Sequence, residues 1–158
     1  MFLAGLAIGV ALWGGYWLLQ RTGQETCRIC RRPIHPDSRT VIEDSGGRRE
    51  AVCCVRCGLF LALQQKSPVR LVEVTDYSSG RSLDPEKASY VEGSGVVMCD
   101  RHEPLFDETK HLYQRVFDRC TPSILAFAGP DEAADFASSH GGRVVRLAEL
   151  LTEAPPAP

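Results

Sequence analysis

The hydrophobic pattern begins with a single long apolar run at the N-terminus. Residues 2–19, FLAGLAIGVALWGGYWLL, contain no charged side chain. At about 1.5 Å per residue, this run nearly spans a hydrocarbon core of roughly 30 Å. Trp13, Tyr16 and Trp17 lie near its end, where aromatic rings favour the membrane interface. No basic n-region or small-x-small cleavage site is present, so we predict an uncleaved transmembrane anchor over residues 1–20.

After a polar linker at 21–26, shorter apolar segments predict a first small module over residues 27–75. The Ser-Gly-Gly triplet within DSGG (44–47) supplies the residues that a hairpin turn needs. Farther along, apolar residues recur at helical spacing. The predicted elements are strands at 39–43 and 49–53, a helix over 54–65 and a strand at 69–75.

A Ser/Gly-rich loop leads into a second predicted module over residues 76–151, before a disordered tail at 152–158. Pro104 suits the first position of a helix. The predicted elements are strands at 88–93 and 95–99, a helix over 104–120, a strand at 123–128, a helix over 130–140 and a strand at 143–147. The fold class is therefore α+β, a transmembrane helix followed by two small strand–strand–helix–strand modules.

Charge and motif content narrow the function classes. The net charge is −2 and no long basic run is present, so nucleic-acid binding has no compositional support. The chain also lacks a Gly-rich phosphate loop and a recognisable nucleophile–base set. We therefore expect neither an enzyme nor a small-molecule substrate.

Two Cys-x-x-Cys pairs carry the strongest chemical signal. Cys27 and Cys30 form the first pair, Cys54 and Cys57 the second, and twenty-three residues separate them. This spacing is typical of tetrathiolate zinc sites, and the order of knuckle, hairpin and helix is that of a treble clef. Thiols at a helix start are also favoured as thiolates by the helix dipole. We predict that the two pairs form one metal site.

Cys53 adds a fifth thiol to this module. At the end of a predicted strand it is either a buried small apolar residue or a further ligand. A site so rich in sulfur suits Cu(I) better than zinc. The metal is therefore Cu(I) or Zn(II) on sequence grounds.

A second candidate group is Met98, Cys99 and His102, a thioether, a thiol and an imidazole within five residues. All three are acceptable copper ligands. The alternative is that Met98 packs in a sheet and His102 is a polar group at a helix start. Cys120 is expected in the core or in a disulfide with Cys99, and His35 is a possible extra ligand.

The C-terminal half resembles the NosL family, accessory proteins of nitrous oxide reductase. The resemblance is carried by SLDPEKASYVEGSGVVM (82–98) and LAFAGPDEAADFASSHGGRVVRLAELL (125–151), and CRICRRPI (27–34) is similar to that family's cysteine motif. It implies a pair of small α+β modules that bind Cu(I) and deliver it to an extracytoplasmic copper centre. Unlike the family, this chain has Arg31 and Arg32 where Gly-Met usually follows the cysteine.

Three function classes follow from these observations. The first is a membrane-anchored metal-binding protein or metallochaperone with a metal-receiving or membrane protein as its partner. The second is a protein-interaction module held together by structural zinc. The third, a Cys-x-x-Cys thiol–disulfide oxidoreductase, is disfavoured because such motifs usually stand alone on a thioredoxin-like frame.

Two arguments disagree about the side of the membrane on which the soluble domain lies. Arg21, Arg28, Arg31 and Arg32 follow the span, which favours a cytoplasmic domain by the positive-inside rule. The family resemblance instead favours the outer side. The arginine bias is small and metal-bound thiolates resist oxidation, so we expect a single-pass membrane protein with an extracytoplasmic domain.

Overall fold

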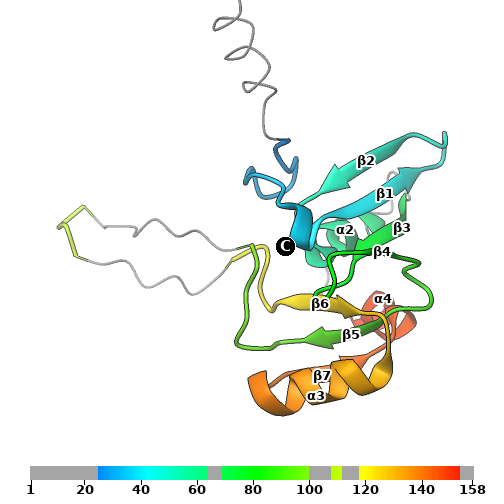
Figure 1. Cartoon of the computed structure of the whole chain (residues 1–158). Helices are drawn as coiled ribbons and strands as arrows, with labels where there is room; N and C mark the ends of the chain where they lie inside the picture. The colour runs from blue at the N-terminus through cyan, green and yellow to red at the C-terminus, as the bar shows by residue number, and fades with distance from the viewer. Residues whose placement is uncertain (1–24, 64–68, 100–107, 112–117, 154–158) are drawn as a thin grey trace, which may run out of the picture.

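The computed structural model describes residues 25–63, 69–99, 108–111 and 118–153. Their strands form two antiparallel sheets that lie one beside the other (Figure 1). The predicted anchor falls outside these ranges. Within them, no helix has the length and apolar character needed to cross a bilayer.

The first sheet has four strands in the order β2-β1-β3-β4. A short 3-10 turn, η1 (Pro36–Ser38), precedes it. The hairpin turn between β1 and β2 is fixed by Asp44, whose Oδ1 accepts hydrogen bonds of 2.9 Å from the backbone N–H groups of Gly46 and Arg48. The strands are β1 (Thr40–Asp44), β2 (Arg49–Val52), β3 (Val69–Thr75) and β4 (Ser82–Leu83).

Helix α2 (Val55–Ala62) packs across this sheet. Gly58 makes the close approach feasible, since a Cβ there would lie 3.2 Å from Thr40 Cγ2 and 3.5 Å from Ile42 Cγ2. The buried face of α2 includes Leu59 and Leu61. This packing fixes the position of the helix N-terminus, where three cysteines gather.

The second sheet has three strands in the order β6-β5-β7, and helix α3 packs on it. Its strands are β5 (Ser89–Glu92), β6 (Ile124–Phe127) and β7 (Arg143–Val145), and the helices are α3 (Pro130–His140) and α4 (Leu147–Glu153). Helix α4 returns to contact α2 of the first sheet, so the two halves meet through helices as well as strands.

The predicted strand–strand–helix–strand order occurs twice, but its second occurrence is built from other elements than the predicted strand at 95–99 and helix over 104–120. In each half the first strand is central, the second and third flank it, and the helix connects these outer strands. The two units are β1-β2-α2-β3 and β5-β6-α3-β7. A long insertion, residues 93–123, separates β5 from β6 in the second unit.

The larger of two apolar core clusters joins the halves. Buried apolar residues of both sheets, such as Leu59, Val74, Tyr90 and Ile124, belong to one continuous cluster. At the seam, the buried Asp76 accepts a 3.1 Å hydrogen bond from the Ala128 N–H. Segments 27–75 and 76–151 therefore share their apolar packing.

The predicted strand at 95–99 is wrong, because these residues form bends. The chain leaves β5 at Gly93, which has a φ of 79°. Both edges of β5 are already paired, with β6 and β7, so no edge remains for a strand formed by the next residues. The hairpin partner of β5 is instead β6, thirty-one residues farther along.

The predicted helix over 104–120 is wrong where the structure describes it. Residues 108–111 form a turn in which Lys110 has a φ of 64°, a left-handed conformation that no α-helix contains. Arg119 and Cys120 also lie in a turn. Residues 104–107 and 112–117 fall outside the described ranges.

Two predicted boundaries shift. Thr26 pairs with Pro33 in an isolated β-bridge, so residues 25 and 26 belong to the fold rather than to the linker. At the other end, α4 continues to Glu153, two residues into the predicted tail, because Leu147 and Leu150 bury this helix against the core.

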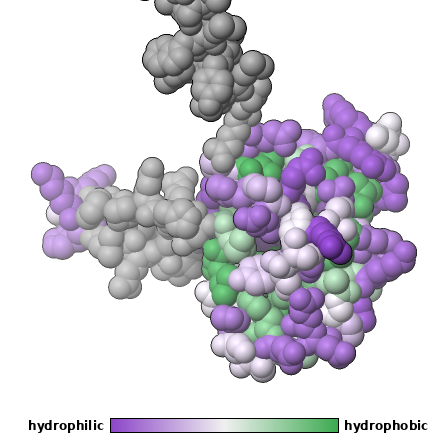
Figure 2. Space-filling view, in the orientation of Figure 1, coloured by the Kyte–Doolittle hydropathy of each residue, from purple (hydrophilic) through white to green (hydrophobic). Residues whose placement is uncertain are grey.

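Polar side chains dominate the surface in the view of Figure 2, and apolar ones form only small patches. Among the described residues, the exposed large apolar side chains are Leu63, Val144 and Leu151. These three lie in different elements or turns. A broad apolar docking face is therefore not a feature of the described surface.

Candidate metal centre

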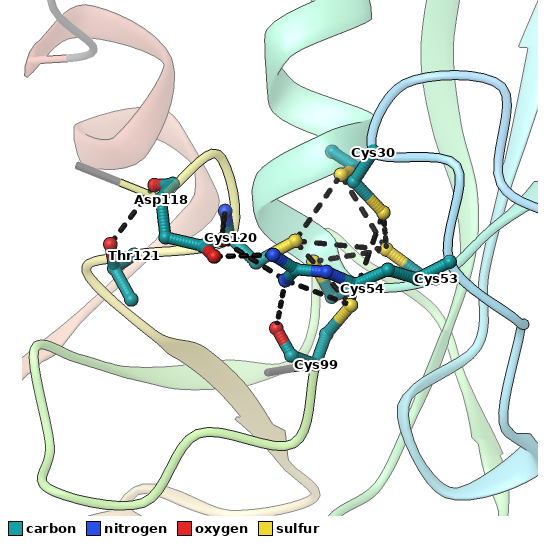
Figure 3. A network of polar contacts seen from close by, with 9 residues as sticks. Cys30, Cys53, Cys54, Cys99, Asp118, Cys120 and Thr121 are labelled. Atoms are coloured by element: carbon teal, nitrogen blue, oxygen red, sulfur yellow. Dashed lines mark hydrogen bonds and ion pairs between the residues drawn. The ribbon is translucent and has the colours of Figure 1, made fainter. Parts of the chain in front are cut away.

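All seven cysteines of the chain converge on one cluster, which we call the seven-cysteine cluster. Figure 3 labels Cys30, Cys53, Cys54, Cys99 and Cys120 within it. They come from three segments far apart in the sequence. All are free thiols, and all but Cys30 are buried. The members are Cys27, Cys30, Cys53, Cys54, Cys57, Cys99 and Cys120.

The first segment is a knuckle that turns back on itself. The Cys27 N–H donates to the Arg32 carbonyl and the Arg31 N–H donates to the Cys27 carbonyl, both at 2.9 Å. Arg31 adopts a φ of 62°, which closes the turn. This geometry places both knuckle thiols, Cys27 and Cys30, in the cluster.

The second segment is the junction between β2 and α2. Cys54 is the N-cap residue in an extended conformation, and its side chain makes no capping hydrogen bond. Cys53 and Cys57 are four residues apart, and their sulfurs lie 3.5 Å from each other. The sulfur of Cys54, at the start of the helix, is the one favoured as a thiolate, because hydrogen bonding to Cys120 lowers its pKa.

The third segment consists of the two ends of the 93–123 insertion. Cys99 stands at one end and Cys120 at the other, and their sulfurs lie 3.4 Å apart. Arg32 ties both ends to the knuckle. Its guanidinium donates to the Cys99 carbonyl at 2.5 Å and forms a two-pronged ion pair with Asp118.

Asp118 in turn accepts a 2.9 Å hydrogen bond from the Cys120 N–H. Both side chains of the ion pair are shielded, Arg32 being 13% and Asp118 10% exposed. The hydrogen bond to Asp118 raises the pKa of Arg32, so the guanidinium stays charged. This buried pair positions two of the three cysteine segments.

The sulfur atoms are close enough to share metal ions. Neighbouring sulfurs lie between 3.2 Å, for Cys30 and Cys53, and 4.0 Å, for Cys53 and Cys120. They form three overlapping quartets, in each of which all four sulfurs lie within 4.8 Å of one another. The quartets are Cys27–Cys30–Cys53–Cys57, Cys30–Cys53–Cys99–Cys120 and Cys53–Cys54–Cys57–Cys120.

These separations suit a thiophilic metal. Metal–sulfur bonds of roughly 2.3 Å place the sulfurs of a tetrahedral site about 3.8 Å apart. The observed separations fall around this value. Soft thiolate donors select Cu(I), Zn(II) or iron–sulfur clusters over hard cations.

The close packing of the thiols shifts their pKa values in opposite directions. Hydrogen bonding to Cys53 lowers the pKa of Cys120 to about 5, and hydrogen bonds from Cys53 and Cys57 lower the pKa of Cys27. Hydrogen bonding to Cys120, among other sulfurs, raises the pKa of Cys53, and burial raises the pKa of Cys30 to about 12. The metal-free cluster is therefore a mixture of thiolates and the thiols that donate to them.

The predicted ligands belong to more than one quartet. Cys27, Cys30 and Cys57 share a quartet whose fourth member is Cys53, whereas Cys54 joins a different quartet. Met98 lines a small cavity of about 20 Å³ together with Cys54, Cys99 and Cys120.

The histidines contribute little to the described part of the site. His102 falls outside the described residues. His35 is exposed, and none of the quartets found among the described residues includes it.

Two features of the cluster were absent from the sequence prediction. Cys120 was expected in the core or in a disulfide with Cys99; it is a free thiol that lies in two of the quartets. The Arg32–Asp118 pair joins residues eighty-six positions apart, which spacing alone does not reveal. The available signal was the presence of three cysteines outside the two Cys-x-x-Cys pairs, Cys53, Cys99 and Cys120.

Comparison with known proteins supports the fold. No protein-family model and no curated protein matches the sequence. The structure is similar to the crystal structure of the copper chaperone NosL from Shewanella denitrificans, with a TM-score of 0.56 and 17% sequence identity. The match covers 79% of this chain and 88% of that one. It confirms, at the level of the fold, the resemblance to NosL seen in the sequence, an α+β domain with antiparallel sheets.

Proposed function

We propose that this chain is a membrane-anchored metallochaperone that binds Cu(I) in the seven-cysteine cluster and passes it to a protein acceptor. The observation that carries the proposal is the convergence of all seven thiols from three segments. A fold shared with a copper chaperone supports the same reading. Cu(I) is the cargo because a monovalent soft ion is satisfied by two or three thiolates and prefers sulfur.

Cys30 is the proposed point of transfer. It is the partly exposed member of the cluster, at the rim of the knuckle. An incoming thiolate or thioether of the acceptor would bond to Cu(I) while the bond to Cys30 breaks, and the released thiolate would take up a proton. Burial favours that protonation, since it raises the pKa of Cys30 to about 12, and protonation would discourage recapture of the ion.

A second candidate function is supported by the position of the cluster. Its sulfurs belong to the core that joins the two halves of the fold, as expected for a structural zinc in a small domain. The two functions differ in the exchangeability of the metal. A structural ion would be needed for folding, whereas a cargo ion must leave a folded protein.

A metal competition on the full chain, purified without oxygen in mild detergent, tests the proposal. We expect Cu(I) to displace bound zinc and to be retained against a Cu(I)-specific chelator, with the far-ultraviolet circular dichroism unchanged on removal of metal. Cargo binding is contradicted if the protein retains zinc in the presence of excess Cu(I), or unfolds when metal is withdrawn.

We further propose that residues 2–19 anchor the chain and that the cluster-bearing domain is extracytoplasmic. The apolar run and the delivery role inferred from the fold support this placement. Protease added to intact spheroplasts should then digest the domain, while a cytoplasmic control protein remains whole. Protection of the domain until the cells are lysed would place it in the cytoplasm instead.

A further inference from the structure

The three quartets overlap in a way that a site for one ion does not require. Cys53 belongs to all three, while Cys30, Cys57 and Cys120 each belong to two. Ions in two different quartets would therefore have to share sulfurs. A thiolate sulfur has more than one lone pair, so it can bridge neighbouring metal ions.

A single ion also leaves too much sulfur unused. A tetrahedral ion in any one quartet would leave three thiols of the cluster without a metal. For the knuckle quartet these are Cys54, Cys99 and Cys120, which are 7%, 5% and 3% exposed. Ordinary core packing does not require buried thiols to contact one another, yet the sulfurs of Cys99 and Cys120 lie only 3.4 Å apart.

Charge leads to the same conclusion. One Cu(I) ion on three or four thiolates leaves a buried site with a net negative charge, which is costly without compensation. The Arg32 guanidinium reaches Cys99 Sγ at 3.8 Å, but Asp118 already neutralises it. When ions share bridging thiolates, each added Cu(I) brings one positive charge and needs fewer new thiolates than a separate site would, so the negative charge per ion falls.

We infer that the seven-cysteine cluster holds two or more Cu(I) ions as one polynuclear thiolate cluster, with Cys53 as the central bridging ligand. This inference rests on the proposed function, because it assumes that Cu(I) is the cargo. It assigns the protein the capacity to carry several ions in one loading event. If the ions share bridging sulfurs, Cu(I) is expected to bind cooperatively, because the first ion orders thiolates that also bind the next ion.

The test is an anaerobic Cu(I) titration of the full chain in detergent, followed by native mass spectrometry and by the luminescence of shielded Cu(I)–thiolate clusters. We expect the metal-free species to convert to a species with at least two Cu(I), with little one-ion species in between, and luminescence to rise with it. Binding that stops at one Cu(I) would overturn the polynuclear inference and leave the proposed function intact.

Two other outcomes are equally decisive. Absence of Cu(I) binding would contradict the proposed function itself. Successive, independent binding of separate ions without luminescence would overturn the bridging arrangement. Cys53→Ser provides a second readout, because loss of the shared sulfur should break the cooperative step and restore a visible one-ion species.

Discussion

Replacing Cys53 by serine is expected to lower the affinity for Cu(I) by more than about 100-fold, since loss of an outer-shell partner alone commonly costs roughly 10- to 100-fold. Cys53 Sγ lies 3.2 Å from Cys30, 3.5 Å from Cys57 and 3.7 Å from Cys54. Serine removes the one sulfur common to all three quartets, and its hard hydroxyl is a poor substitute for a soft thiolate. Competition with a Cu(I)-specific chelator would measure the change.

The matched control is Cys54→Ser, one residue away in the same junction. Cys54 belongs to a single quartet, so two quartets remain complete and a clearly smaller loss is expected. Both variants remove one buried thiol of similar exposure, which makes them comparable in their effect on packing. An equal loss of affinity in the two variants would show that Cys53 has no central position.

Replacing Arg32 by methionine is expected to destabilise the fold by about 3–5 kcal/mol, the typical cost of breaking a buried ion pair from one side. The substitution removes the Arg32 guanidinium from beside the shielded Asp118 carboxylate. It also removes the hydrogen bond to the Cys99 carbonyl. Urea denaturation of the metal-free protein would measure the change in the free energy of unfolding.

Lys87→Met is the matched control for this substitution. Lys87 pairs with Asp84 at 3.2 Å, but the two side chains are 85% and 48% exposed, so almost no change in the free energy of unfolding is expected. If Arg32→Met costs no more than this control, the Arg32–Asp118 pair does not hold the insertion to the knuckle. Arg32→Lys should fall between the two, because lysine keeps the charge but loses the two-pronged geometry.

The first half of the fold was predictable because its local signals agree with one another. The DSGG turn, the strands on either side and the helical spacing after Cys54 all favour the same hairpin and helix, and the structure has them as β1, β2 and α2. Strand β3 has the predicted bounds, 69–75. Consistent local preferences of this kind define an element without knowledge of its neighbours.

The second half shows where local preference fails. The residues at 95–99 have strand propensity, but the partner of a strand is chosen by the whole sheet, and β5 already pairs on both edges. The apolar spacing over 104–120 includes Cys120, whose side chain lies in the sulfur cluster rather than on a helix face. A periodic pattern cannot distinguish these two reasons for burial.

Only the ligands that lie close together in the sequence could be predicted to form one site. The Cys-x-x-Cys spacing indicated Cys27, Cys30, Cys54 and Cys57, because knuckles and helix starts bring such thiols together. Cys99 and Cys120 reach the same place because the two ends of the insertion meet there, where Arg32 bonds to the Cys99 carbonyl and to Asp118. That contact depends on tertiary closure, so it has no signature in the spacing of the cysteines.

X-ray absorption at the copper edge of the Cu(I)-loaded full chain tests most directly whether the cluster binds copper. If the seven thiols provide the ligands, we expect the copper to remain Cu(I) and to have only sulfur atoms as its nearest neighbours. A shell containing nitrogen or oxygen neighbours would place the metal elsewhere, on histidine, carboxylate or solvent, and would contradict binding of Cu(I) in the seven-cysteine cluster.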